Sequence, residues 1–108
     1  MYELRSININ KEENKNNIIE MEKEVVELFN KTCVSFPKVI RLTEKRSVKI
    51  RSRIKEDGDF DILKIVFEKM ENSNFLKGQN KTGWKASFDW LFDNQEDWLK
   101  VVEGYYDN

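Results

Sequence analysis

Histidine is absent from this chain of 108 residues, and cysteine is represented only by Cys33. A zinc site of the usual kind draws most of its ligands from these two residue types, so we expect no such metal site. Catalytic triads built on histidine are excluded for the same reason. A single cysteine cannot form an internal disulfide, which indicates a reducing compartment, and we expect a cytoplasmic protein.

Long apolar runs are also lacking. A membrane-spanning helix needs about 20 consecutive apolar residues, and no segment approaches that length or matches the apolar region of a signal peptide. Charged residues make up 36% of the chain, yet the net charge is only −1, so the overall charge favours neither nucleic acid nor membranes. A chain of this length has room for one domain with one hydrophobic core.

The one proline, Pro37, and a few glycines divide the chain into segments with helical periodicity. We expect helices over residues 18–31, 43–55, 60–71 and 84–92, and a fifth between Asn94 and Gly104. The residues suited to cap helix N-termini are Asn17, Thr43, Asp59 and Asn94. The predicted fold is all-α: a compact orthogonal bundle of four to five short helices with an extended N-terminal arm. Residues 1–16 are expected to be a linker or docking arm, and residues 17–108 the helical domain.

Positive charge is concentrated between residues 38 and 55, where eight basic residues face one acid and leave a local surplus of +7. The second expected helix places Lys45, Arg46, Lys49 and Arg53 on one arc, which we expect to face solvent. Such an arc can neutralise phosphates and release counterions, but it is equally typical of a solvated helix face. Acids gather from residue 86 onward. They could pair with the basic half within the molecule or in a neighbour, which would remove the argument for DNA.

Aromatic residues are concentrated in the last third of the chain, with eight of thirteen from residue 75 onward. Tryptophans can stack on unpaired bases. Trp84 and Trp98, however, fall on apolar stripes and are expected in the core, whereas Trp90 lies off the main stripe.

The same region contains Lys77, Lys81 and Lys85 and two glycines, Gly78 and Gly83. Basic residues and glycines next to aromatic residues are typical of a loop that binds nucleic acid or another ligand. A nucleotide phosphate loop is not indicated, because Trp84 stands where that motif needs lysine.

The order of these features resembles the C-terminal domain of phage- and prophage-type replication proteins, the replisome organisers and related initiators. The resemblance covers about residue 18 to the end. It is carried by Phe36-Pro37-Lys38-Val39, Leu42-Thr43-Glu44-Lys45-Arg46, Ile50-Arg51-Ser52-Arg53, Asn74-Phe75-Leu76-Lys77-Gly78, Asn80-Lys81-Thr82-Gly83-Trp84-Lys85-Ala86-Ser87-Phe88-Asp89-Trp90-Leu91 and Glu103-Gly104-Tyr105-Tyr106-Asp107-Asn108. The spacing of Trp84, Phe88 and Leu91 is also similar to the signature of DnaD-like primosomal domains.

The resemblance implies a non-catalytic module of DNA replication, without cofactors, that binds DNA, single-stranded or origin DNA, and helps to recruit a replicative helicase or its loader. Such domains normally follow a winged-helix domain. We therefore expect either an excised domain with residues 1–16 as the old linker or a short stand-alone relative. The expected DNA contacts are Lys45, Arg46, Lys49, Arg53, Lys77, Lys81 and Lys85. The alternative is a protein–protein interaction module that docks through its aromatic C-terminal region without touching DNA.

Overall fold

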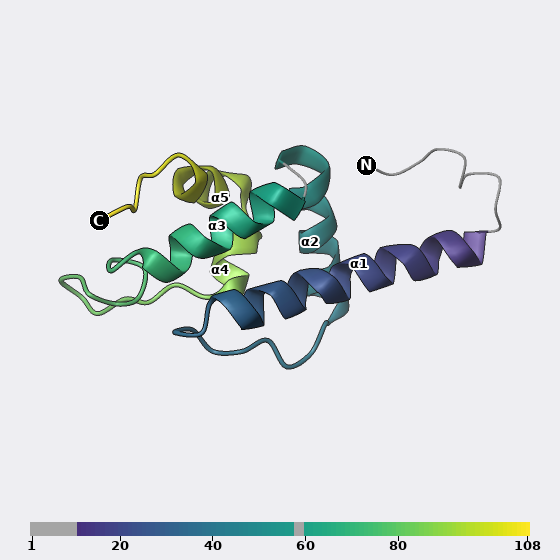
Figure 1. Ribbon diagram of the computed structural model, residues 1–108, viewed down its shortest axis with the longest axis horizontal. Coiled ribbons are helices and arrows are strands. Elements are labelled where there is room, and N and C mark those ends of the chain that lie inside the picture. The colour runs from purple at the N-terminus through teal and green to yellow at the C-terminus, as the bar shows by residue number, and fades with distance from the viewer. Residues whose placement is uncertain (1–10, 58–59) are drawn as a thin grey trace.

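The computed structural model describes residues 11–57 and 60–108. Over these ranges the chain forms five α-helices and no β-strand (Figure 1). They are α1 (Lys11–Thr32), α2 (Glu44–Asp57), α3 (Phe60–Asn72), α4 (Phe88–Asp93) and α5 (Gln95–Val102). The all-α prediction is confirmed, and none of these helices is long and apolar enough to cross a membrane.

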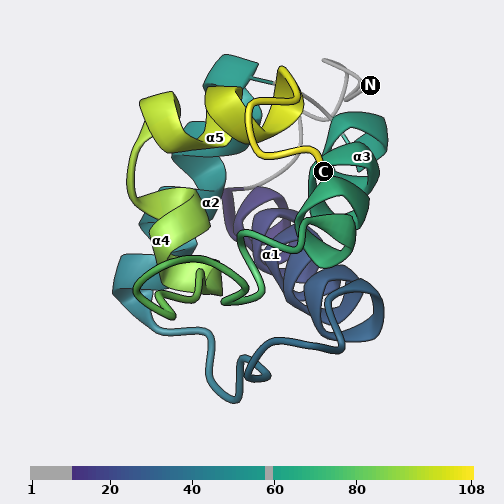
Figure 2. The same cartoon turned by 90° about the vertical axis from the view of Figure 1, so that its left-hand side faces the viewer.

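The helices pack around α1 and α3, which lie against each other (Figures 1 and 2). Helix α2 contacts α1, and the short α4 connects the two halves because it contacts both α2 and α5. Helix α5 closes the bundle against α3. The loop of residues 73–87, which leads into α4, lies at the same end of the molecule as the C-terminal residues (Figure 1).

The core is built from aromatic rings of four helices. Phe29 of α1 makes edge-on contacts with Phe67 of α3, at 5.4 Å between ring centres, and with Phe88 of α4, at 5.1 Å. Phe92 stacks on Phe88 at 4.3 Å and contacts Trp98 of α5 at 5.2 Å. Each such pair adds about 0.5–1.5 kcal/mol to the burial of its apolar area. The prediction that Trp98 lies in the core is confirmed.

Two of the expected caps are confirmed. The Thr43 hydroxyl accepts from the Arg46 amide at 3.2 Å, and the Asn94 side chain accepts from the Asp97 amide at 2.8 Å. Asp59 lies outside the described residues. Asn17 was wrong as a cap, because α1 begins at Lys11 and includes residues 11–16 that we had placed in the linker. Lysine and glutamate are good helix formers, so a polar stretch can extend an amphipathic helix.

The predicted start of the fourth helix was also wrong. Helix α4 begins at Phe88, four residues later than expected, because Ser87 is extended (φ −152°, ψ 170°) and its side chain caps the helix by accepting from the Trp90 amide. The residues before it instead return along the loop, where the Ala86 amide donates to the Leu76 carbonyl at 2.9 Å. Trp84 therefore belongs to a loop and not to a helix.

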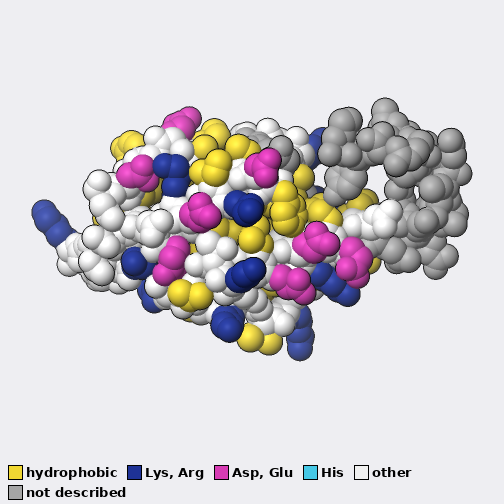
Figure 3. All heavy atoms as spheres, in the orientation of Figure 1, with side chains coloured by type: hydrophobic (Ala, Val, Ile, Leu, Met, Phe, Trp, Pro, Cys, Tyr) yellow, Lys and Arg dark blue, Asp and Glu magenta, His cyan; other side chains and the backbone are white. Residues whose placement is uncertain are grey.

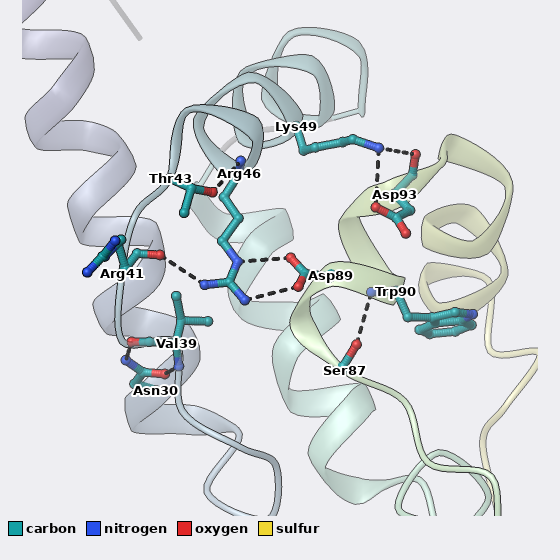
Figure 4. Close-up of polar contacts among 10 residues, drawn as sticks. All are labelled: Asn30, Val39, Arg41, Thr43, Arg46, Lys49, Ser87, Asp89, Trp90 and Asp93. Carbon is teal, nitrogen blue, oxygen red and sulfur yellow. Dashed lines mark hydrogen bonds and ion pairs between the residues drawn. The ribbon is translucent and has the colours of Figure 1, made fainter.

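The connector of residues 33–43 runs back beneath α1 and is anchored by buried Phe36 and Val39. Asn30 of α1 holds Val39 by both main-chain groups: Oδ1 accepts from the Val39 amide at 2.8 Å, and Nδ2 donates to the Val39 carbonyl at 3.0 Å (Figure 4). Because α2 starts directly after this connector, the connector sets where the basic residues of α2 lie.

Candidate nucleic-acid interface

The basic arc of α2 faces the acidic residues of α4 (Figure 4). Arg46 donates from Nε and NH2 to the two carboxylate oxygens of Asp89, at 2.9 and 3.0 Å, and from NH1 to the Arg41 carbonyl at 2.9 Å. Lys49 Nζ lies 3.2 Å from a carboxylate oxygen of Asp93. Two of the expected phosphate contacts are thus already paired within the molecule, which is the intramolecular pairing that the charge distribution left open.

Arg53 does not face solvent as expected. Its side chain is buried, with 7% of the residue exposed, and it forms an ion pair with Glu56 at 3.0 Å. Arg53 follows the buried Ile50 by three residues and so shares its face of the helix. Of the four α2 residues expected to bind phosphates, only Lys45 is exposed and outside a direct ion pair among the described residues.

The pairing with Arg46 shifts the pKa of Asp89. The pKa of its carboxyl lies below the ordinary value, chiefly because the carboxylate accepts hydrogen bonds from Arg46 and is also close to the positive charges of Lys45 and Lys49. Partial desolvation opposes this shift but does not reverse its direction. Asp89 is therefore ionised at neutral pH, and Arg46 has a charged partner with which any phosphate would have to compete.

The loop of residues 73–87, hereafter the lysine loop, is organised by the side chain of Asn80. Its Nδ2 donates to the carbonyls of Phe75 and Trp84, at 2.9 and 2.7 Å, while its Oδ1 accepts from the amides of Thr82 and Trp84, at 3.2 and 3.0 Å. Gly83 at the turn has φ +77°, a conformation that glycine adopts at little cost. Four main-chain groups and the Thr82 hydroxyl, which donates to Oδ1 at 3.2 Å, are thus tied to one amide, and the loop has a defined shape.

Three lysines project from the lysine loop, and its sequence contains no acid. None of Lys77, Lys81 and Lys85 pairs with a carboxylate among the residues that the structure describes. Lys85 places its Nζ 5.5 Å from the centre of the Phe36 ring. Figure 3 shows the tip of the loop at the left-hand end of the molecule, with a dark blue side chain and no magenta beside it. In contrast to α2, this loop keeps its positive charge available.

Beside these lysines lies a group of four rings, Phe75, Trp84, Trp90 and Tyr106, hereafter the aromatic cluster. Trp84 contacts Phe75 at 6.1 Å and Trp90 at 5.2 Å between ring centres, and Tyr106 stacks on Phe75 at 5.5 Å. The prediction that Trp84 lies in the core was wrong, because 39% of the residue is exposed, and Phe75 is 43% exposed. Trp90 is half-buried, so the cluster rests on the core and opens to solvent.

Comparisons with family models, with curated proteins and with solved structures found no match to this chain. The candidate interface therefore rests on the sequence and the geometry described above. Within the described ranges, no group of three or more potential metal-ligating side chains is present.

Tyr106 and its neighbour Tyr105 were not among the residues expected from the sequence to contact DNA. The sequence signal for them is weak. Two adjacent tyrosines after Gly104 indicate only a C-terminal tail, and their spacing does not show that Tyr106 returns to the lysine loop. The contact depends on the left-handed turn at Gly104, which has φ +86° and redirects the chain after α5.

Proposed function

We propose that this chain is a non-catalytic module of DNA replication that binds single-stranded DNA through the lysine loop and the aromatic cluster. The observation that supports it best is the arrangement of the lysine loop. Its three lysines pair with no carboxylate of residues 11–57 and 60–108, and solvent-exposed rings lie in the same loop. The resemblance to phage- and prophage-type replication proteins supports the same setting, with recruitment of a helicase or its loader as the further role.

The two chemistries in this loop match the two parts of a nucleic-acid strand. Lysines neutralise phosphates and release counterions, which gives binding that weakens with salt. Aromatic faces stack on bases, with about 1–3 kcal/mol for each base that stacks. Stacking of this kind needs bases that are not paired, so the combination favours single strands over duplex DNA.

The basic arc of α2 has a smaller place in this proposal than the sequence suggested. Arg46 and Lys49 are occupied by Asp89 and Asp93, and Arg53 is buried. Within the described residues, Lys45 is the one member of that arc that is both exposed and outside a direct ion pair, so it is the one that can add positive charge for a phosphate.

A second candidate is a protein-docking module, favoured by the exposure of the cluster. Phe75 and Trp84 expose apolar area on a shaped surface, and aromatic residues of this kind are enriched at protein interfaces. Salt separates the two candidates, because an apolar dock depends on it far less than a phosphate contact does.

The test is a titration of labelled single-stranded and double-stranded DNA of equal length with the purified chain at two salt concentrations. We expect tighter binding to the single strand and a steep loss at the higher salt. The triple variant Lys77→Gln, Lys81→Gln, Lys85→Gln should reduce the slope of log affinity against log salt by about 2, at about 0.7 for each phosphate contact.

The matched control is the triple variant Lys23→Gln, Lys31→Gln, Lys64→Gln, which removes the same charge from exposed positions on α1 and α3. It should bind like the wild type. If both triple variants lose affinity equally, the effect is one of net charge and the lysine loop is not the contact. If the folded wild type binds no DNA at low salt, the proposal fails and docking of a protein becomes the leading function.

A further inference from the structure

The residues that follow α5 return to the lysine loop and close it against α3 (Figures 1 and 2). Asn108 bridges the point where α3 ends: its Oδ1 accepts from the Asn74 amide at 2.8 Å, and its Nδ2 donates to the Asn72 carbonyl at 2.8 Å. One side chain thus satisfies both a donor at the start of the loop and an acceptor at the end of the helix. Residues 105–108 are called the tail below.

Two further contacts fix the tail. The hydroxyl of Ser73, a buried residue, donates to the Tyr106 carbonyl at 2.7 Å and accepts from the Leu76 amide at 3.1 Å. Lys69 of α3 pairs with Asp107 at 3.1 Å. The tail is therefore held by side chains of α3 and the lysine loop, and the negative charge of Asp107 already has a partner.

Fixing the tail assembles the aromatic cluster. The Tyr106 ring stacks on Phe75 with an angle of 21° between the ring planes and meets Trp90 edge-on at 5.9 Å. It therefore joins a ring of the lysine loop to a ring of α4. Trp84 also joins these two elements through its ring, because it contacts both Phe75 and Trp90.

The tail also extends the cluster toward solvent. Tyr105 is 72% exposed, its ring lies 5.5 Å from that of Tyr106, and Lys100 of α5 places its Nζ 5.3 Å from the Tyr105 ring centre. The tail and α5 thus offer an exposed aromatic ring next to a positive charge, which is the same combination that the lysine loop offers. The two surfaces are continuous through Tyr106.

We infer that the tail is part of the nucleic-acid interface, with Tyr105 stacking on an unpaired base and Asn108 acting as a positioning residue for Tyr106 and the aromatic cluster. This inference rests on the proposed function. It adds a second stacking position, beyond the lysine loop, and it makes the shape of the interface depend on a side chain that touches no DNA.

The experiment measures binding of a labelled oligothymidylate to the full chain and to Tyr105→Ala, Tyr105→Phe and Asn108→Ala. Tyr105→Ala should bind the oligothymidylate about tenfold more weakly than the wild type, because one stacked base is lost. The phenylalanine variant should bind like the wild type, because it keeps the ring. The slope of log affinity against log salt should stay unchanged in all variants, since no phosphate contact is lost.

Asn108→Ala should weaken binding and change the near-UV circular dichroism of the aromatic cluster, with the far-UV spectrum and the melting temperature nearly unchanged. A residue with a merely structural role would lower the melting temperature and leave affinity of the folded protein intact. That result would overturn the positioning role.

The outcomes separate the inference from the function on which it rests. If the wild type binds and the lysine-loop triple variant is weakened while Tyr105→Ala binds normally, the tail is not in the interface and the proposed function stands. If the folded wild type does not bind the oligothymidylate at low salt, the proposed function and the inference both fail.

Discussion

Arg46 of α2 and Asp89 of α4 form a two-pronged ion pair across 43 positions of sequence, with Nε and NH2 at 2.9 and 3.0 Å from the two carboxylate oxygens. Lys49 and Asp93 repeat the contact one turn further along both helices. The basic and acidic segments of the chain are therefore neighbours in space, and much of the local charge surplus of α2 is cancelled where the two helices meet.

Removing the two acids should expose the cations of α2. We expect Asp89→Asn combined with Asp93→Asn to bind DNA more tightly at low salt, with a steeper dependence on salt, because Arg46 and Lys49 become available to phosphates. The gain should not depend on whether the DNA is single-stranded. Stability should fall by about 0.2–1 kcal/mol for each lost surface pair, measured by urea unfolding. An unchanged affinity would show that this face lies away from bound DNA.

The Arg46–Asp89 pair also predicts the response of stability to acid. The pKa of Asp89 is lower in the folded protein than the value of about 3.9 for an unfolded chain. Its contribution to the free energy of unfolding is therefore complete above pH 4 and is lost as the pH falls through the folded pKa. The Asp89→Asn variant should lose less stability than the wild type on acidification below pH 4, measured by urea unfolding at a series of pH values. Parallel curves would contradict this.

Cys33 should be unreactive in the native protein. Burial, together with the nearby negative charge of Glu71, raises the pKa of its thiol to about 12, and Sγ donates to the Phe67 carbonyl at 3.3 Å. Because the thiolate is the reacting species, iodoacetamide at pH 8 should label the folded protein very slowly and the urea-unfolded protein at the rate of a free thiol. Rapid labelling without denaturant would mean that the end of α1 opens readily.

The side chain of Asn80 should decide the shape of the lysine loop. Asn80→Ala removes the hydrogen bonds of this side chain to Phe75, Thr82 and Trp84, and we expect a loss of about 1–2 kcal/mol in stability together with weaker binding of single-stranded DNA. The matched control is Gln79→Ala, an exposed neighbour in the same loop. Normal DNA binding by Asn80→Ala would show that the loop need not be preformed.

The amphipathic elements of the fold followed well from the sequence. The periodicity located α2, α3 and α5 within one or two residues, since each has an apolar stripe and a clear start or stop. Trp84 and Phe88 misled the same reasoning: their spacing is helical, yet the Asn80 hydrogen bonds and the Ser87 cap hold the residues between them outside the helix. Such competition between side chain and backbone is local chemistry that an apolar pattern does not reveal.

The candidate site was less predictable than the fold. Charge counts identified Arg46 and Lys49 but not their partners, because Asp89 and Asp93 become neighbours only when α4 packs on α2. The structure places Lys77, Lys81 and Lys85 in one loop, and whether they bind DNA stays a prediction. The aromatic cluster needed the fold, since Tyr106 reaches Phe75 from 31 positions away through the turn at Gly104.

The hold of Asn30 on Val39 has a chemical consequence for the whole bundle. An amide can face a peptide group with both a donor and an acceptor, and a carboxylate of the same shape offers two acceptors. Conversion of Asn30 to aspartate, by substitution or by deamidation as the protein ages, would set an oxygen against the Val39 carbonyl where Nδ2 now donates. A change of one atom would thus remove one of the two hydrogen bonds that hold Val39 to α1, and the connector that leads into α2 would depend more on its buried side chains, Phe36 and Val39.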